Sequence, residues 1–218
     1  MRKQFIFLLL VCLSFSAIAQ IGAIIGNDNR QNGHVSKKGK TPFSTTKLAF
    51  AITKDATSDK DKVFAIYKWI ASNISYDNEL RLSAELQKEF YTSEENVTKK
   101  VLERKMALCG GFAFLFKSLC ENVGVPTEVI HGFTKDYSGK IQKSKIPNHT
   151  WNAVKLNGKW KLLDITWAIS YGSNNKADDF WFLTKPADFI LSHFPEDRKW
   201  TLLGNPISFS EFQKHSVK

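Results

Sequence analysis

The sequence predicts an α+β protein in which helices from the first half of the chain pack on an antiparallel sheet from the second half. Between Ser58 and Val123, apolar side chains recur at helical spacing in several stretches. After Gly124 the pattern changes to short runs rich in Val, Ile, Trp and Thr, which is typical of strands. The pair Asn157-Gly158 lies between two such runs and is the strongest short-range signal for a β-hairpin.

The first 19 residues are predicted to be a secretory signal peptide. A basic start is followed by an apolar run over residues 5–13 and by the small-residue ending Ala17-Ile18-Ala19, so cleavage is expected after Ala19. One alternative is a lipoprotein anchor at Cys12, which the bulky Val11 disfavours. Another is a retained transmembrane anchor, for which the apolar run is too short. We therefore expect a secreted or periplasmic protein with no membrane span.

The rest of the chain divides into a flexible lead and one domain. Residues 20–41 are rich in Gly, Asn and Lys without sustained periodicity, so a flexible N-terminal segment is expected. Residues 42–218 form the predicted domain, which is long enough for one hydrophobic core.

Loss of Arg2 and Lys3 with the signal peptide would lower the formal net charge from +10 to +8. The scattered lysines favour an ordinary solvated surface, with contact to an anionic envelope surface as the alternative. Nucleic acid is not an expected partner of an exported chain.

Two regions before residue 105 are predicted to be helical. Ser58 is suited to cap a helix that ends near Asn73. One or two further short helices are expected within residues 80–104, the later one beginning around Thr92 or Ser93. This last helix is followed closely by Cys109.

Cys109 begins a third predicted helix, which stops at Gly124. A thiol at a helix start lies near the positive end of the helix dipole and near free backbone N–H groups, and both lower the pKa of a cysteine. The alternative is a cysteine that only packs in the core. Without the signal peptide the chain keeps Cys109 and Cys120, eleven positions apart in this helix, so they cannot form a disulfide with each other. Cys120 is interpreted as core packing, and Cys109 as a candidate reactive thiol.

The predicted sheet brings a histidine and an aspartate together. A strand is expected at residues 127–133, followed by a hairpin of residues 150–156 and 159–167. A two-residue turn would pair Trp151 with Asp164 and His149 with Thr166, which makes His149 and Asp164 diagonal neighbours on one face. A β-bulge would break this alignment. An acid beside a histidine fixes its tautomer and stabilises its charged form.

The C-terminal part is predicted to contain a strand at residues 179–184, a short helix beginning at Pro186 and an aromatic-rich closing segment. Three other histidines, His34, His131 and His193, are interpreted as structural or uninvolved. Because no Cys/His pair has the spacing of metal ligands, neither a metal nor another cofactor is expected.

Cys109, His149 and Asp164 together match a Cys-His-acid arrangement, in which an imidazole activates a thiol and the acid orients the imidazole. The surrounding sequence resembles the transglutaminase-like superfamily, and within it the branch that contains kyphoscoliosis peptidase. The resemblance covers roughly residues 58–204. It is carried by the stretches Cys109–Ala113, His149–Val154 and Trp160–Trp167, with support from Ala65–Asp77, Phe182–Pro186, His193–Pro195 and Trp200–Leu203.

The resemblance implies a papain-like fold, with a helical part that bears Cys109 packed on an antiparallel sheet that bears His149 and Asp164. It implies Cys109 as nucleophile, His149 as general base and acid, and Asp164 as the residue that orients the histidine.

An oxyanion also needs hydrogen-bond donors, and the backbone N–H of Cys109 is the expected first one. Trp69, Tyr76 and Gly110 are the candidates for further oxyanion or substrate contacts, although an aromatic on an amphipathic helix such as Trp69 is often a core residue.

Three functions remain open from the sequence. The first is a cysteine peptidase or amidase that cleaves a protein or peptide through an acyl-enzyme. The second is acyl transfer to an amine, as in a transglutaminase, with the same residues. The third is a scaffold domain that keeps the fold without chemistry, against which the complete set of three residues argues.

Overall fold

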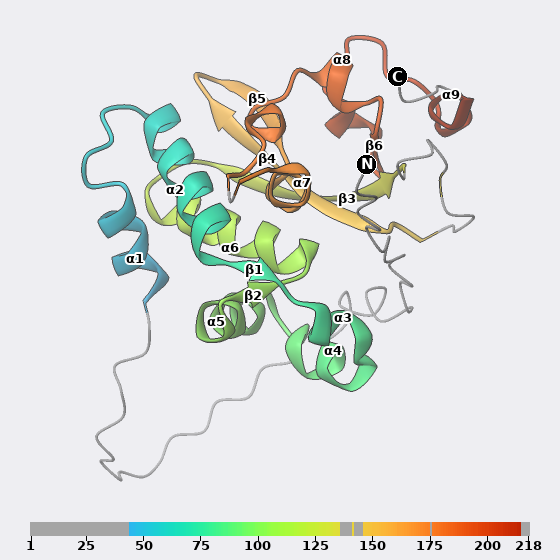
Figure 1. The fold of residues 1–218 in the computed structure, drawn as a ribbon. Coiled ribbons are helices and arrows are strands. Elements are labelled where there is room, and N and C mark those ends of the chain that lie inside the picture. The colour runs from blue at the N-terminus through green and yellow to red at the C-terminus, as the bar shows by residue number, and fades with distance from the viewer. Residues whose placement is uncertain (1–43, 136–140, 142–145, 175, 215–218) are drawn as a thin grey trace, which may run out of the picture.

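The computed structural model describes residues 44–135, 141, 146–174 and 176–214. The protein is an α+β fold, as predicted, with the helices of its first half packed against a four-stranded antiparallel sheet (Figure 1). The signal peptide and the flexible segment predicted at residues 1–19 and 20–41 lie outside the described residues. Within the described residues, no helix is both long enough and apolar enough to cross a membrane.

The helical half forms as the capping residues predict. Ser58 accepts a hydrogen bond from the backbone of Asp61 at 3.2 Å and begins the second helix, and Ser93 does the same for Asn96 at 3.1 Å. Residues 78–104 hold three helices, where one or two were expected. In chain order the elements are α1 (Thr45–Ile52), α2 (Asp59–Asn73), β1 (Ser75–Tyr76), α3 (Asn78–Leu82), α4 (Ala84–Phe90), α5 (Glu94–Arg104) and β2 (Met106–Ala107).

Helix α6 (Cys109–Asn122) is the centre of the fold. It contacts α1, α2 and α5 and also the strands β3 (Thr127–Thr134) and β4 (His149–Leu156). Cys120 is fully buried in it, as expected. From β4, the buried amide of Asn152 donates to the carbonyl of Ala113 in α6 at 3.1 Å and so ties the sheet to the helix. The helix ends before Gly124, whose φ of 80° is the left-handed conformation that glycine adopts at helix ends.

The predicted hairpin forms between β4 and β5 (Lys159–Leu163). Asn157 and Gly158 both have positive φ, 49° and 76°, which is the two-residue turn that this pair favours. The register runs from Leu156 opposite Lys159 to Asn152 opposite Leu163, as predicted.

The predicted second strand is too long, however, because the chain after Leu163 turns into helix α7 (Ile165–Tyr171), which Asp164 caps. Thr166 is therefore helical, and the expected pairing of His149 with Thr166 is wrong.

The C-terminal part is partly as predicted. A helix, α8 (Pro186–Phe189), begins at Pro186, but residues 179–184 are not a strand. Asp178 accepts a hydrogen bond from the backbone of Phe180 at 2.9 Å, which starts the short 3₁₀ helix η2 (Asp179–Trp181), and Thr184 alone forms an isolated bridge to Leu162. The closing elements are β6 (His193–Pro195), η3 (Arg198–Thr201) and α9 (Phe209–Lys214).

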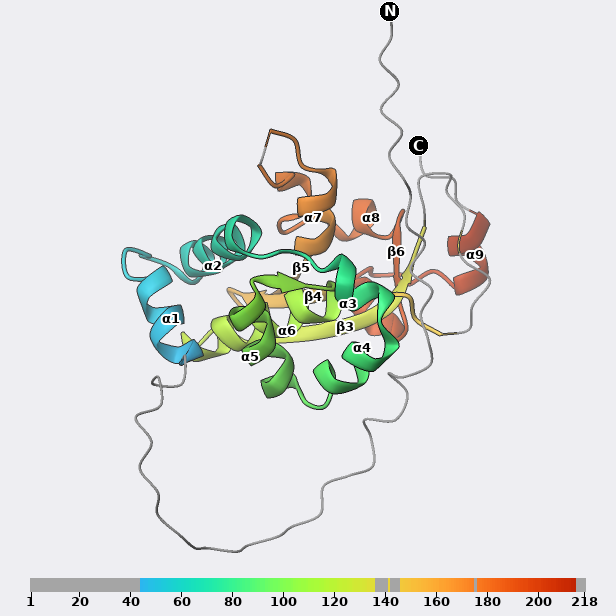
Figure 2. The ribbon, with the colours of Figure 1, turned by 60° about the horizontal axis from the view of Figure 1, so that its bottom comes forward.

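The strand order β5-β4-β3-β6 places β3 between the hairpin and β6. In Figure 2, α7 and α8 lie above the sheet and α5 lies below it, while α6, which contacts β3, β4 and α7, overlaps the sheet in this view. Gly132 of β3 is opposite His149 of β4 and also opposite Pro195 of β6. A β-carbon at Gly132 would overlap the ring of Trp151 and the carbonyl of Phe194. The absence of a side chain here therefore lets Trp151 and β6 approach each other across β3.

We predict that Gly132→Ala lowers the free energy of unfolding by about 3 kcal/mol or more, because the added methyl overlaps backbone that cannot move aside. Gly204→Ala is the matched control, since open space surrounds that position, and its effect should stay within about 0.5 kcal/mol. Urea denaturation measures both. Equal stability of the two variants would contradict this account of the packing.

Candidate active site

Cys109 is the first residue of α6, and its side chain is only half-buried. Leu108, the residue before it, gives the helix no side-chain cap. The N–H groups of the first turn are therefore directed toward the region of the thiol without a capping oxygen. The hydrogen bond between the Gly110 backbone and the thiol is one of the contacts that lower the pKa of Cys109.

His149, the first residue of β4, faces both Cys109 and Asp164. Its Nε2 lies 2.6 Å from Oδ2 of Asp164 and both side chains are buried. With Nε2 bound to the carboxylate, Nδ1 is the nitrogen that remains for the hydrogen bond with the Cys109 thiol. The structure thus brings together the three residues that the sequence analysis named as nucleophile, base and orienting acid.

Asp164 holds its position through its backbone and through both carboxylate oxygens. Its Oδ1 accepts a hydrogen bond of 2.9 Å from the backbone N–H of Trp167, which caps α7, and its own N–H donates to the carbonyl of Trp181 at 3.0 Å. Oδ2 is left to face His149. The register of the hairpin therefore sets the position of Asp164, and its role as the cap of α7 sets the orientation of its carboxylate.

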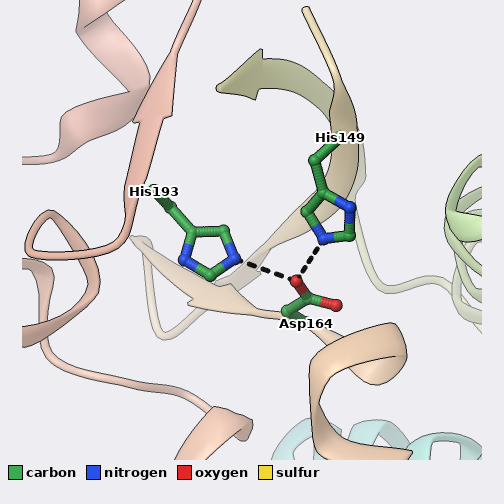
Figure 3. A group of neighbouring side chains, drawn as sticks. All are labelled: His149, Asp164 and His193. Carbon is green, nitrogen blue, oxygen red and sulfur yellow. Dashed lines mark hydrogen bonds and ion pairs between the residues drawn. The ribbon is translucent and has the colours of Figure 1, made fainter. Parts of the chain in front are cut away.

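A second histidine contacts the same carboxylate oxygen. Nε2 of His193 lies 3.0 Å from Oδ2 of Asp164, and Figure 3 shows His149 and His193 approaching this atom from two sides. On its other side, Nδ1 of His193 is 2.8 Å from Oγ of Ser192. The sequence analysis treated His193 only as structural, and its segment before Phe194 carries no local sign of this contact.

The rings around His193 form an apolar enclosure. The side chain of His193 is completely buried, and four aromatic ring centroids lie 4.2 to 5.3 Å from its own. These rings belong to Trp151, Trp167, Trp181 and Phe189. Such surroundings disfavour a charged imidazole.

The protonation states follow from these contacts. Burial raises the pKa of the Cys109 thiol, but the hydrogen bond and the positive charge of His149 outweigh this effect, so the pKa of Cys109 falls below its usual value. Burial alone would lower the pKa of His149, whereas Asp164 and Cys109 raise it to about 10. Both shifts favour a thiolate next to an imidazolium over a neutral thiol next to a neutral imidazole.

The pKa values of Asp164 and His193 are both lower than usual. Burial disfavours the Asp164 carboxylate, yet His149 and His193 hold its pKa well below the usual range. Burial also lowers the pKa of His193 to about 4, despite the attraction of Asp164. The carboxylate is thus charged and His193 is neutral at pH 7.

His149, Asp164 and His193 together also have the composition of a metal site, with one potential ligand atom from each side chain. However, the oxygen of Asp164 is 2.6 and 3.0 Å from the two ring nitrogens. Ligands of a tetrahedral zinc would be separated by roughly 3.3 Å. The separations fit shared protons, so the arrangement in this conformation is a hydrogen-bond chain.

The candidates for oxyanion or substrate contacts lie in different places. Gly110 follows Cys109 in the first turn of α6. Tyr76 is half-buried in β1, opposite Ala107 of β2. Trp69 is half-buried on α2, with Nζ of Lys105 5.3 Å from its ring centroid. Their assignment to substrate contact stays a prediction.

Tyr91, which follows α4, is a residue that the sequence analysis missed. A β-carbon at Gly110 would lie 3.2 Å from Cε1 and 3.5 Å from Oη of Tyr91, so the ring lies against the first turn of α6. Burial, and after it the negative charge of Cys109, raise the pKa of Tyr91 well above its usual value, which keeps the hydroxyl protonated beside the thiol. Only the tertiary fold brings α4 to this point.

A thiol at the start of a buried helix, next to a histidine and an aspartate supplied from an antiparallel sheet, defines the papain-like class of folds. A family model described as "Transglutaminase-like superfamily" matches residues 46–165. The chain belongs to this superfamily.

Named relatives agree with the resemblance to the kyphoscoliosis peptidase branch. The chain is 32% identical over 174 residues to "Kyphoscoliosis peptidase" of Mus musculus, an alignment that covers 76% of this chain and 25% of that protein. It is 30% identical to "Lim and transglutaminase domain protein ltd-1" of Caenorhabditis elegans, with 78% and 25% covered. The chain thus spans about a quarter of the length of these curated relatives. A solved structure described as a TGase shares 23% identity with a TM-score of 0.41 and covers 62% of this chain and 32% of that one.

We predict that Asp164→Asn slows iodoacetamide labelling of Cys109 at pH 6 by about tenfold. Loss of the carboxylate lowers the pKa of His149, and a neutral His149 no longer lowers the pKa of the thiol. This indirect effect is expected to outweigh removal of the direct repulsion between Asp164 and the thiolate. Asparagine caps helices as well as aspartate does, so α7 should stay folded. Labelling is followed by peptide mass spectrometry, with the buried Cys120 as internal reference, because burial raises the pKa of that thiol.

The matched control is Asp178→Asn, which changes a capping aspartate of η2 and leaves the pair of Cys109 and His149 intact. It should label like the unchanged protein. Equal labelling of all three proteins at pH 6 would show that Asp164 does not sustain the ion pair.

Proposed function

We propose that this protein is a thiol hydrolase that cleaves amide bonds of proteins or peptides through an acyl-enzyme on Cys109. The observation that carries the proposal is the buried chain of hydrogen bonds from Asp164 through His149 to the thiol of Cys109, a residue that is not fully buried. It is the arrangement that makes a cysteine nucleophilic at neutral pH. The printed name of the mouse and human relatives, "Kyphoscoliosis peptidase", supports amide hydrolysis ahead of acyl transfer.

The proposed reaction has two steps. In the first, the thiolate of Cys109 attacks the amide carbonyl and forms a C–S bond, and the C–N bond then breaks as the imidazolium of His149 gives its proton to the leaving amine. In the second, water attacks the thioester and gives a proton to His149, and the C–S bond breaks to release the acid and restore the thiolate. Asp164 keeps the imidazole oriented in both steps.

The helix start is suited to the negative oxygen that develops on the carbonyl. The backbone N–H of Cys109 is the proposed first donor for this oxygen, because it lies at the positive end of α6 next to the attacking sulfur. The protonated hydroxyl of Tyr91 lies against the same turn and is the side chain best placed to add a second hydrogen bond.

Incubation with a peptide library prepared from whole-cell protein, together with a biotinylated primary amine, tests this function. We expect new peptide N termini, detected by mass spectrometry, and a loss of at least about 10³-fold in Cys109→Ala. Cys120→Ala is the matched control, because it removes a thiol from the same helix away from the site, and it should keep the activity.

The products separate the alternatives. Amine incorporated at glutamine, without new N termini, would replace hydrolysis by acyl transfer. Cleavage that persists in Cys109→Ala, or unchanged peptides with a Cys109 that labels no faster than Cys120, would contradict a thiol enzyme and favour the scaffold function.

We further propose that the protein acts outside the cytoplasm, on the basis of the signal-like residues 1–19. Expression of the full chain in a Gram-negative host should give a periplasmic protein whose N terminus, read by mass spectrometry, is Gln20. A cytoplasmic protein that retains Arg2 and Lys3 would contradict this localisation.

A further inference from the structure

We propose that His193 is a positioning residue of the site: as a neutral imidazole it donates a hydrogen bond to Asp164 and thereby fixes the carboxylate that holds His149 toward Cys109. The inference rests on the proposed function only in that it concerns the same thiol. It adds a fourth side chain, from a segment beyond the residues 46–165 that the family model matches.

The first step of the argument is the distribution of donors on Asp164. From the described part of the chain, Oδ1 receives a hydrogen bond from the backbone of Trp167, and Oδ2 receives two, from His149 and His193. Donors on both oxygens fix the rotation of the carboxylate about its bond to the side chain. Without His193, Oδ2 would be held only by the ring that it is meant to orient.

The second step is the tautomer of His193. A neutral imidazole has one donor and one acceptor nitrogen. Nε2 faces a carboxylate, which can only accept, so the proton is on Nε2. Nδ1 is then the acceptor, and the hydroxyl of Ser192 donates to it at 2.8 Å. Ser192, itself buried, thus keeps the Nε2 proton directed at Asp164.

The third step is the charge. Among the residues that the structure describes, the ionisable groups that act on His193 are Asp164 and His149, whose ring centroid is 5.6 Å away. A second positive charge next to the His149 imidazolium would compete for the same oxygen. The enclosure of Trp151, Trp167 and other aromatic rings prevents this by keeping His193 neutral. His193 therefore holds the carboxylate without neutralising it.

The position of His193 is set by β6. This strand pairs with β3 on the edge opposite to β4, so His149 and His193 come from the two strands that flank β3. The ring centroids of the two imidazoles are 5.6 Å apart.

The test measures iodoacetamide labelling of Cys109 between pH 4.5 and 9 in three full-length variants. In His193→Leu we expect the pH at which labelling begins to rise by about one unit, which is about a tenfold slower reaction at pH 6. His193→Gln should restore the profile, because its amide nitrogen can donate to Asp164 from the same place. His131→Leu is the matched control, since His131 lies in the same sheet but bonds to Thr150.

Several outcomes would overturn the proposal. One is a His193→Leu profile equal to that of the unchanged protein, even with a lower melting temperature. Another is a His193→Gln profile as displaced as that of His193→Leu. A third is an NMR spectrum of the ¹⁵N-labelled imidazoles in which His193 is charged, or protonated on Nδ1, at pH 7.

None of these readouts requires a substrate, so failure of the amide cleavage assay leaves them decisive. If labelling of Cys109 in the unchanged protein begins at no lower pH than labelling of an ordinary thiol, the ion pair of Cys109 and His149 is absent. Both proposals would then fail.

Discussion

The carboxylate of Asp164 is the constraint on which the rest of the site depends. It is charged and buried, a state that costs much free energy unless its oxygens accept hydrogen bonds. The fold provides these donors from separate parts of the chain: the first turn of α7, the start of β4 and the start of β6. The contacts that satisfy this buried charge therefore join α7, β4 and β6 at one point, and the same contacts orient the base beside the thiol.

Local signals in the sequence accounted for much of the fold and for the three residues at its centre. The caps at Ser58 and Ser93, the helix from Cys109 to Gly124 and the Asn157-Gly158 turn depend on neighbouring residues, so their predictions were confirmed. The register of the hairpin follows from the turn alone. The use of Cys109, His149 and Asp164 in catalysis stays a prediction, although the structure brings them together.

The errors arise where tertiary contacts outweigh local pattern. Residues 179–184 are aromatic enough for a strand, but the Asp178 cap and the contact of Trp181 with Asp164 bend them into a 3₁₀ turn. Asp164 likewise ends β5 early, because its side chain caps a helix. His193 reaches the site through pairing of β6 with β3, and Tyr91 through the contact of its ring with the first turn of α6. Neither contact has a signature in nearby residues.

The turn at Asn157-Gly158 has a consequence for how this gene can change. Exposed loops usually tolerate insertions, because their length seldom affects the core. Here the number of residues in the turn decides which residue of β5 faces each residue of β4, and thus whether the chain leaves the sheet with a carboxylate beside His149. A solvent-exposed loop about 25 Å along the strand from His149 is therefore under the same selection as the site itself. Tolerance to insertion at this loop cannot be judged from its exposure.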